Sequence, residues 1–231
     1  GLATLQDGVD FRGKTLSSNL DITTRALWLY FGHGGTSHRH YDTLQLGIDA
    51  FGMNLSPDLG YPSDTGAQGG KIRDHWVSGT VSHNTVVVND KRQRRTTESG
   101  DVMHFDDSGE VKVVDVDAPE AYNTDVDTYR RTVVSVDVDD TVSYALDFFR
   151  IIGGDEHVYS FHAQSREAES SLDMQVQSTG TYAGMNVPYG DDTYSASHDS
   201  GYNYLKNVER AQNPGTGSFT VDFDIEKMRP Y

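Results

Sequence analysis

The sequence predicts an all-β protein built as an antiparallel β-sandwich. Three observations lead to this prediction. Apolar and polar residues alternate with a period of two along most of the chain, the alternating segments are rich in Val, Tyr, Phe and Thr, and Gly, Asp, Asn or Ser bound them. No segment shows a persuasive helical stripe; residues 155–170 come nearest, and their Val-Tyr-Phe content favours a strand. Many short antiparallel strands between turns are typical of a β-sandwich or a jelly roll.

The individual strands are expected as follows. In chain order they are residues 25–32, 43–51, 83–89, 110–117, 129–140, 141–152, 157–164 and 217–226. A hairpin around Asp139 and Asp140 should join the fifth and sixth of them. The stretch from Ser178 to Gly217 is rich in Gly, Tyr, Ser, Asn and Asp, which favours long loops. We therefore divide the chain into a main sandwich, residues 1–177, and a loop-rich segment with terminal strands, residues 178–231, in the same or an adjoining β module.

Composition limits the class of protein. With 231 residues the chain is long enough to bury a sizeable core. Its net charge of -16 argues against nonspecific binding of nucleic acid, which needs a basic surface. The absence of cysteine excludes disulfides and thiolate metal sites, and no stretch approaches the ~18 apolar residues of a membrane span. Because the chain opens with Gly-Leu-Ala and no leader, we expect a processed or excised part of something longer.

Basic residues gather in one run of this acidic chain. Lys91, Arg92, Arg94 and Arg95 fall within "NDKRQRR", and Arg73 lies shortly before it. One interpretation is a solvated hairpin tip. The other is a local site for an anionic ligand, which concentrated positive charge would attract.

Two histidines stand one residue apart in "SHRHYD". On an extended segment His38 and His40 would point to the same face. Asp58 follows His40 by 18 residues, inside a Ser-Pro-Asp-Leu-Gly turn, and His83 opens a later expected strand. Imidazole nitrogens and a carboxylate suit a divalent ion such as zinc that keeps one open position. Histidines that only complete hydrogen bonds in the fold are the alternative.

These residues lie within longer motifs. The runs "SHRHYDTLQLGIDAFGMNLSPDLGYP", "VSGTVSHNTVVVND" and "DFFRIIGGDEHVYSFHA" resemble the heparinase II/III-like polysaccharide lyases, and "GLATLQDG" is similar to the strand that opens their β domain. The resemblance covers roughly residues 1–165 and implies the super-β-sandwich of that family. It also implies that His40, Asp58 and His83 hold a structural zinc and that His38 is the catalytic histidine that faces the substrate.

The activity that the resemblance implies is β-elimination at a uronic acid of an anionic polysaccharide. We assign substrate contacts to Tyr61, Arg73, Arg92 and Arg94. The family's lyases place an α/α toroid before the β domain, and nothing helical of that kind exists here. Full activity would therefore require a preceding toroid or a companion chain. A polymeric substrate implies a secreted or periplasmic protein, and exposed sandwich edges would allow a homodimer.

Two other functions compete with the lyase. The spacing of Gly32, His38, His40, Gln45 and Gly52 is similar to the first cupin motif, in which both histidines would bind a catalytic iron or manganese. Gln45 replaces the usual glutamate of that motif, and the second cupin motif does not follow. The remaining alternative is a noncatalytic β module that binds a glycan or stabilises a larger enzyme. Whether His38 binds the metal or points away from it separates the lyase from the cupin.

Overall fold

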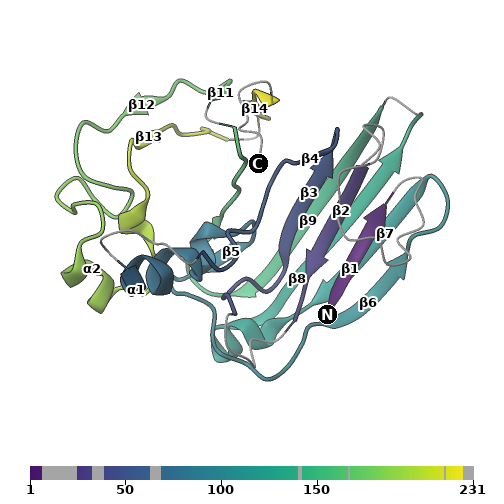
Figure 1. The fold of residues 1–231 in the computed structure, drawn as a ribbon, viewed down its shortest axis with the longest axis horizontal. Helices are drawn as coiled ribbons and strands as arrows, with labels where there is room; N and C mark the ends of the chain where they lie inside the picture. Colours follow the sequence, from purple (N-terminus) through teal and green to yellow (C-terminus); the bar gives the residue numbers. More distant parts are fainter. Residues whose placement is uncertain are drawn as a thin grey trace.

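Two four-stranded antiparallel sheets pack face to face and form the sandwich that the sequence predicts (Figure 1). The computed structural model describes residues 1–6, 25–32, 39–62, 69–139, 142–165, 167–215 and 217–225. The first sheet has the order β1-β2-β3-β4, with β1 (Leu2–Gln6), β2 (Arg25–Tyr30), β3 (Gln45–Ala50) and β4 (Met53–Asn54). The second has the order β6-β7-β8-β9, with β6 (Asp101–Asp106), β7 (Val111–Asp117), β8 (Val126–Asp137) and β9 (Ser143–Gly153).

The core lies between the two sheets and follows the two-residue period of the sequence. Leu27 and Leu29 of β2 and Val114 and Val116 of β7 belong to one buried cluster. Tyr129 of β8 is fully buried in the same cluster. Because side chains two apart share a face of a strand, this alternation places one face of each sheet against the other.

The hairpin that the sequence predicts is present. β8 and β9 pair in antiparallel register from Val126↔Gly153 to Asp137↔Ser143. Val138 donates its backbone N–H to the carbonyl of Val142 across the turn. Residues 140 and 141 of this turn lie outside the described part of the chain.

The rest of the described chain forms short pairs of strands and single helical turns. The pairs are β5 (Val86–Val88) with β10 (His157–Tyr159), β11 (Ala168–Ser170) with β14 (Val221–Phe223), and β12 (Gln175–Val176) with β13 (Glu209–Arg210). The helical turns are α1 (Gly69–Ile72), the π-helical Arg73–Val77, α2 (Asp192–Ser197), and the 3₁₀ turns Thr80–Ser82, Pro119–Ala121, Asn123–Asp125 and Tyr202–Tyr204. Figure 1 shows α1, α2 and the β12–β13 pair beyond one end of the sandwich.

Two pairs of strands cross the boundary predicted between residues 177 and 178. β11 and β12 precede it, and their partners β14 and β13 follow it. The division into two segments itself stays a prediction. No helix of the described residues is long and apolar enough to cross a membrane.

The strand expected at residues 83–89 is shorter than predicted. Only Val86–Val88 is extended in a sheet, because a 3₁₀ turn precedes it and closes with the His83 N–H donating to the Thr80 carbonyl. Arg39 and His40 likewise lie outside any strand. His38 falls outside the described residues.

Candidate metal centre

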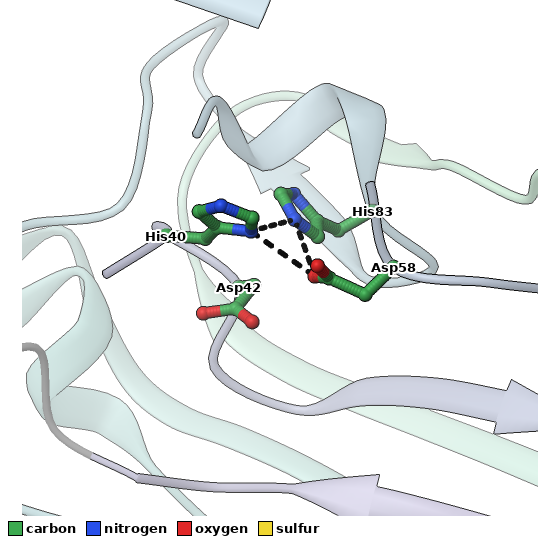
Figure 2. A group of neighbouring side chains, drawn as sticks. All are labelled: His40, Asp42, Asp58 and His83. Atoms are coloured by element: carbon green, nitrogen blue, oxygen red, sulfur yellow. Dashed lines mark hydrogen bonds and ion pairs between the residues drawn. The ribbon is translucent and has the colours of Figure 1, made fainter. Parts of the chain in front are cut away.

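Three side chains from separate segments converge on one point, and they are the three that the sequence proposes as metal ligands (Figure 2). The Nδ1 atom of His40 lies 3.0 Å from the Nε2 atom of His83 and 3.1 Å from the Oδ2 atom of Asp58. The Nε2 of His83 and the Oδ2 of Asp58 are 3.0 Å apart. Asp42 completes a group whose ligand atoms all lie within 4.8 Å of one another.

The turn that follows β4 orients the Asp58 carboxylate. Its Oδ1 accepts a hydrogen bond of 2.6 Å from the backbone N–H of Gly60, and Gly60 adopts a positive φ of 61°. This is an Asx turn, for which the Ser-Pro-Asp-Leu-Gly sequence is suited. Because the turn uses Oδ1, the other oxygen is left to face the two histidines.

A hydrogen bond to the Gly79 carbonyl orients the His83 ring. Its side chain is fully buried, and its Nδ1 lies 2.6 Å from the carbonyl oxygen of Gly79. A carbonyl only accepts, so Nδ1 carries the proton and Nε2 of a neutral ring presents a lone pair to the cluster. Ser82 holds the same turn, because its hydroxyl contacts the Trp76 carbonyl at 2.6 Å and the Gly79 carbonyl at 2.8 Å. Such carbonyl–histidine contacts commonly orient metal ligands.

The cluster has too few protons to be held by hydrogen bonds alone. With His83 neutral, its bare Nε2 faces the ionised Oδ2 of Asp58, and the single proton available on His40 Nδ1 serves only one of them. A second proton on His83 would place a charged ring in a fully buried position, which costs free energy. A divalent cation removes the repulsion between these lone pairs. Two imidazole nitrogens and one carboxylate oxygen form a donor set that fits zinc.

The two neighbouring imidazole rings favour the ionised form of the carboxylate. Burial raises the pKa of Asp58, but its interactions with the His40 and His83 rings outweigh burial and hold that pKa far below its usual value. Burial lowers the pKa of His40, whereas the hydrogen bond and charge of Asp58 raise it more, so the net shift is upward. Burial also raises the pKa of Asp42, which is only 8% exposed.

A buried arginine ties the segments that carry the candidate ligands to the second sheet. Arg131 of β8 is 0% exposed and donates from Nη1 to the carbonyls of Leu44, at 2.6 Å, and Asn84, at 2.5 Å. Its Nε and Nη2 bind the Asp147 carboxylate at 2.9 and 2.7 Å, and Nη2 also contacts the Tyr159 hydroxyl. Leu44 ends the segment that carries His40, and Asn84 follows His83. Sequence reasoning missed Arg131, although it shares the core-facing side of β8 with Tyr129 and Val133.

Gln45 has a partner other than the metal cluster. Its side chain is buried, and its Oε1 accepts a hydrogen bond from the backbone N–H of Asn84. The cupin interpretation would need this position as a ligand, so the geometry disfavours it.

Of the proposed substrate contacts, Tyr61 and Arg73 lie against each other, and Arg92 and Arg94 have other partners. Arg73 stacks over the ring of Tyr61 with its guanidinium carbon 4.6 Å from the ring centroid. Arg92 forms an ion pair of 2.6 Å with Asp199. Arg94 is exposed, and its backbone N–H donates to the carbonyl of Ala121.

Tyr41, next to His40, is surrounded by arginines that sequence reasoning did not connect with it. Arg95 donates from Nε to the Tyr41 hydroxyl at 2.8 Å, and the guanidinium carbon of Arg92 lies 4.1 Å from the ring centroid. The guanidinium carbon of Arg39 lies 5.4 Å from the same centroid. Burial raises the pKa of Tyr41, but the Arg95 hydrogen bond and the three positive charges lower it more.

Comparison with known proteins gives one family. The family model described as "Heparinase II/III-like, C-terminal" matches residues 29–210. A heparan sulfate lyase HepC mutant from Pedobacter heparinus has a TM-score of 0.51 at 18% identity, over 68% of this chain and 24% of that one. The heparinase III BT4657 gene product has a TM-score of 0.50 at 18% identity, over 76% of this chain and 29% of that one. At this identity the likeness shows the fold, and the chain spans about a quarter of these structures. No curated protein matches the sequence significantly.

Proposed function

Because this chain belongs to the heparinase II/III-like C-terminal family, we propose that it is the β domain of a lyase that cleaves a uronic-acid-containing anionic polysaccharide by β-elimination. The observation that carries this proposal is the convergence of His40, Asp58 and His83 from three segments of the chain. These residues lie in the sequence motifs that resemble those of the family, and their two imidazole nitrogens and one carboxylate oxygen fit zinc.

We assign the metal a structural role. His40, Asp58 and His83 would hold zinc, which supplies the positive charge that keeps three loops together and adds binding free energy to folding. The metal takes no part in the proposed proton transfers or in breaking the C4–O4 bond. Its effect on the reaction is to fix the backbone on which the neighbouring His38 is placed.

His38 carries the proposed proton chemistry of this chain. In β-elimination the C5 proton of the uronate leaves, the C4–O4 bond breaks, a C4–C5 double bond forms, and the departing O4 gains a proton. A histidine can exchange a proton near neutral pH, which suits one of these two transfers. The negative charge that develops on the sugar carboxylate requires positioned donors. We assign those donors and the second proton-transfer group to a toroid domain or a companion chain.

The loop after Asp58 supports a substrate contact. Tyr61 is 47% exposed, and Arg73 stacks on its ring and donates from Nη2 to the Pro62 carbonyl at 3.0 Å. An exposed aromatic ring with a guanidinium group at its face can contact both the apolar and the anionic side of a sugar acid. Arg92 and Arg94 stay predicted contacts. A polymeric substrate favours a secreted or periplasmic location, and a homodimer stays a prediction.

One observation favours a supporting role for the chain by itself. It spans about a quarter of the solved structures that it matches. The second candidate function is therefore a noncatalytic module that binds glycan or stabilises the larger enzyme.

Ultraviolet absorbance of unsaturated uronate separates these functions. The assay is run over a panel of uronate polymers with this chain alone and with a longer protein that includes a toroid. We expect product only from the longer protein, and His38→Ala should abolish it without loss of metal. The control is His104→Ala, which removes an exposed histidine of β6. Absence of product from both proteins over the whole panel would contradict the lyase.

A further inference from the structure

Guanidinium groups gather around Tyr41, one residue from the candidate metal ligand His40. Arg92 and Arg39 lie over its ring at 4.1 and 5.4 Å, and Arg95 donates to its hydroxyl at 2.8 Å. This concentration of like charge stands out in a chain whose net charge is -16. Like charges repel, so such a group is stabilised when an anion binds to it.

Among the residues that the structure describes, only Arg92 of these three arginines has a close ion pair. Arg92 binds the Asp199 carboxylate at 2.6 Å and donates to the Asp74 carbonyl at 3.1 Å. Both contacts hold its guanidinium against the ring of Tyr41, so Arg92 serves as a support.

The other two arginines keep donors available. Arg39 has no hydrogen-bond or ion-pair partner among the described residues, and its guanidinium group lies over the ring of Tyr41. Arg95 is exposed and uses Nε for the Tyr41 hydroxyl; its terminal nitrogens have no hydrogen-bond partner among the described residues. The carboxylate of Asp74 acts on Arg95 through its charge, without an ion pair. Two guanidinium groups with unused donors therefore lie against the same tyrosine side chain, one over its ring and one at its hydroxyl.

We propose that Arg39 and Arg95, held against Tyr41, form a binding site for the carboxylate or sulfate groups of an anionic polysaccharide. The planar fork of a guanidinium group binds either anion through paired hydrogen bonds, and stacking on an aromatic ring restricts its motion before the anion binds. The site rests on the proposed lyase function and extends it, because Tyr41 directly follows the candidate metal ligand His40 in the chain. Arg94, which the sequence alone favoured, has no such ring contact with a described residue.

Equilibrium binding tests this site without any catalytic step. The probes are a fluorescein-labelled heparin oligosaccharide, which carries sulfates and carboxylates, and a labelled hyaluronan oligosaccharide, which carries carboxylates alone. Fluorescence anisotropy is measured with the zinc-loaded chain at several salt concentrations. The variants are Arg39→Gln and Arg95→Gln. The control is Arg210→Gln, because Arg210 also stacks on a tyrosine, Tyr182, at 4.5 Å and its substitution removes the same charge.

We expect each of the two variants to weaken binding about fivefold (about 1 kcal/mol) and to reduce its salt dependence. Arg210→Gln should bind like the unsubstituted chain, and Arg39→Lys should recover part of the loss. Equal weakening by all three glutamine variants would overturn the site in favour of a general effect of net charge. Absence of binding by the unsubstituted chain at low salt, or no change in either variant, would also overturn it.

The product assay on the longer protein decides the lyase function separately. A loss confined to heparin identifies sulfate as the ligand group, whereas a loss with both probes identifies carboxylate.

Discussion

Replacing His83 with alanine tests the metal centre through the effect of zinc on protein stability. The substitution removes one of three ligands and also a buried ring that contacts the Gly79 carbonyl at 2.6 Å. The loss of that hydrogen bond costs about 1–3 kcal/mol with or without metal. The specific prediction therefore concerns the increase in melting temperature that zinc produces, and not the melting temperature itself.

The size of this increase follows from mass action. At a free zinc concentration 1,000 times its dissociation constant, binding stabilises the native chain by about 4.1 kcal/mol. Loss of even an outer partner of a metal ligand weakens affinity about 10–100-fold, so loss of a ligand itself should cost at least about 100-fold. The same zinc concentration then stabilises the variant by about 1.4 kcal/mol. At about 2–4 °C per kcal/mol for a domain of this size, the increase falls from about 8–16 °C to about 3–6 °C.

Thermal unfolding with and without a chelator measures this increase, and elemental analysis measures the zinc content of the same samples. The matched control is His162→Ala. His162 is partly buried and contacts the Val81 carbonyl at 2.7 Å, but it does not belong to the cluster. His162→Ala should lower the melting temperature and keep the full increase with zinc. A full increase in His83→Ala, or the same reduction in both variants, would refute the assignment.

Three further outcomes are expected. Asp58→Asn removes the only charged ligand but retains an oxygen for the Gly60 turn, so elemental analysis should find markedly less zinc at equal protein. Arg131→Met should lower the free energy of unfolding of the metal-free chain by about 1–3 kcal/mol in urea titrations, because it removes the buried donor to the carbonyls of Leu44 and Asn84. The hydrogen bond from Arg130 lowers the pKa of Asp115, so this carboxylate stabilises the native chain above its unfolded pKa of about 3.9 and loses that contribution as the pH falls below it. Urea unfolding at pH 7 and pH 3 should therefore show a smaller loss of stability for Asp115→Asn than for the unsubstituted chain.

The two-residue period predicted the strands that bury one face. β2, β3, β7 and β8 all lie within or next to the expected segments, since burial of one face imposes the alternation that the sequence displays. β9 also lies next to its expected segment, although most of its residues are exposed. β6 was missed because all six of its residues are exposed and impose no alternation. A register shift between Val102 and His104 interrupts its pairing further. α1 and α2 were missed because four and six residues are too few to display a helical period.

Residue type and spacing drew attention to His38, His40, Asp58 and His83, and the family resemblance implied that the last three are the ligands. The backbone that carries them was not predicted. The turn before His83 depends on the Ser82 hydroxyl and the Gly79 carbonyl. The run of valines from Val86 to Val88 favours a strand and gives no sign of these contacts. Arg131 was missed because its partners are remote: it lies 87 residues from Leu44 and 47 from Asn84. The only local sign was a charged residue on the apolar side of a predicted strand.

The most direct test of the metal centre is anomalous diffraction at the zinc edge from crystals of the chain grown with zinc. We expect one peak bonded to the Nδ1 of His40, the Oδ2 of Asp58 and the Nε2 of His83, with the ring of His38 outside the coordination sphere. A peak that has His38 as a ligand in place of one of these residues, or no peak between the three atoms, would contradict the account.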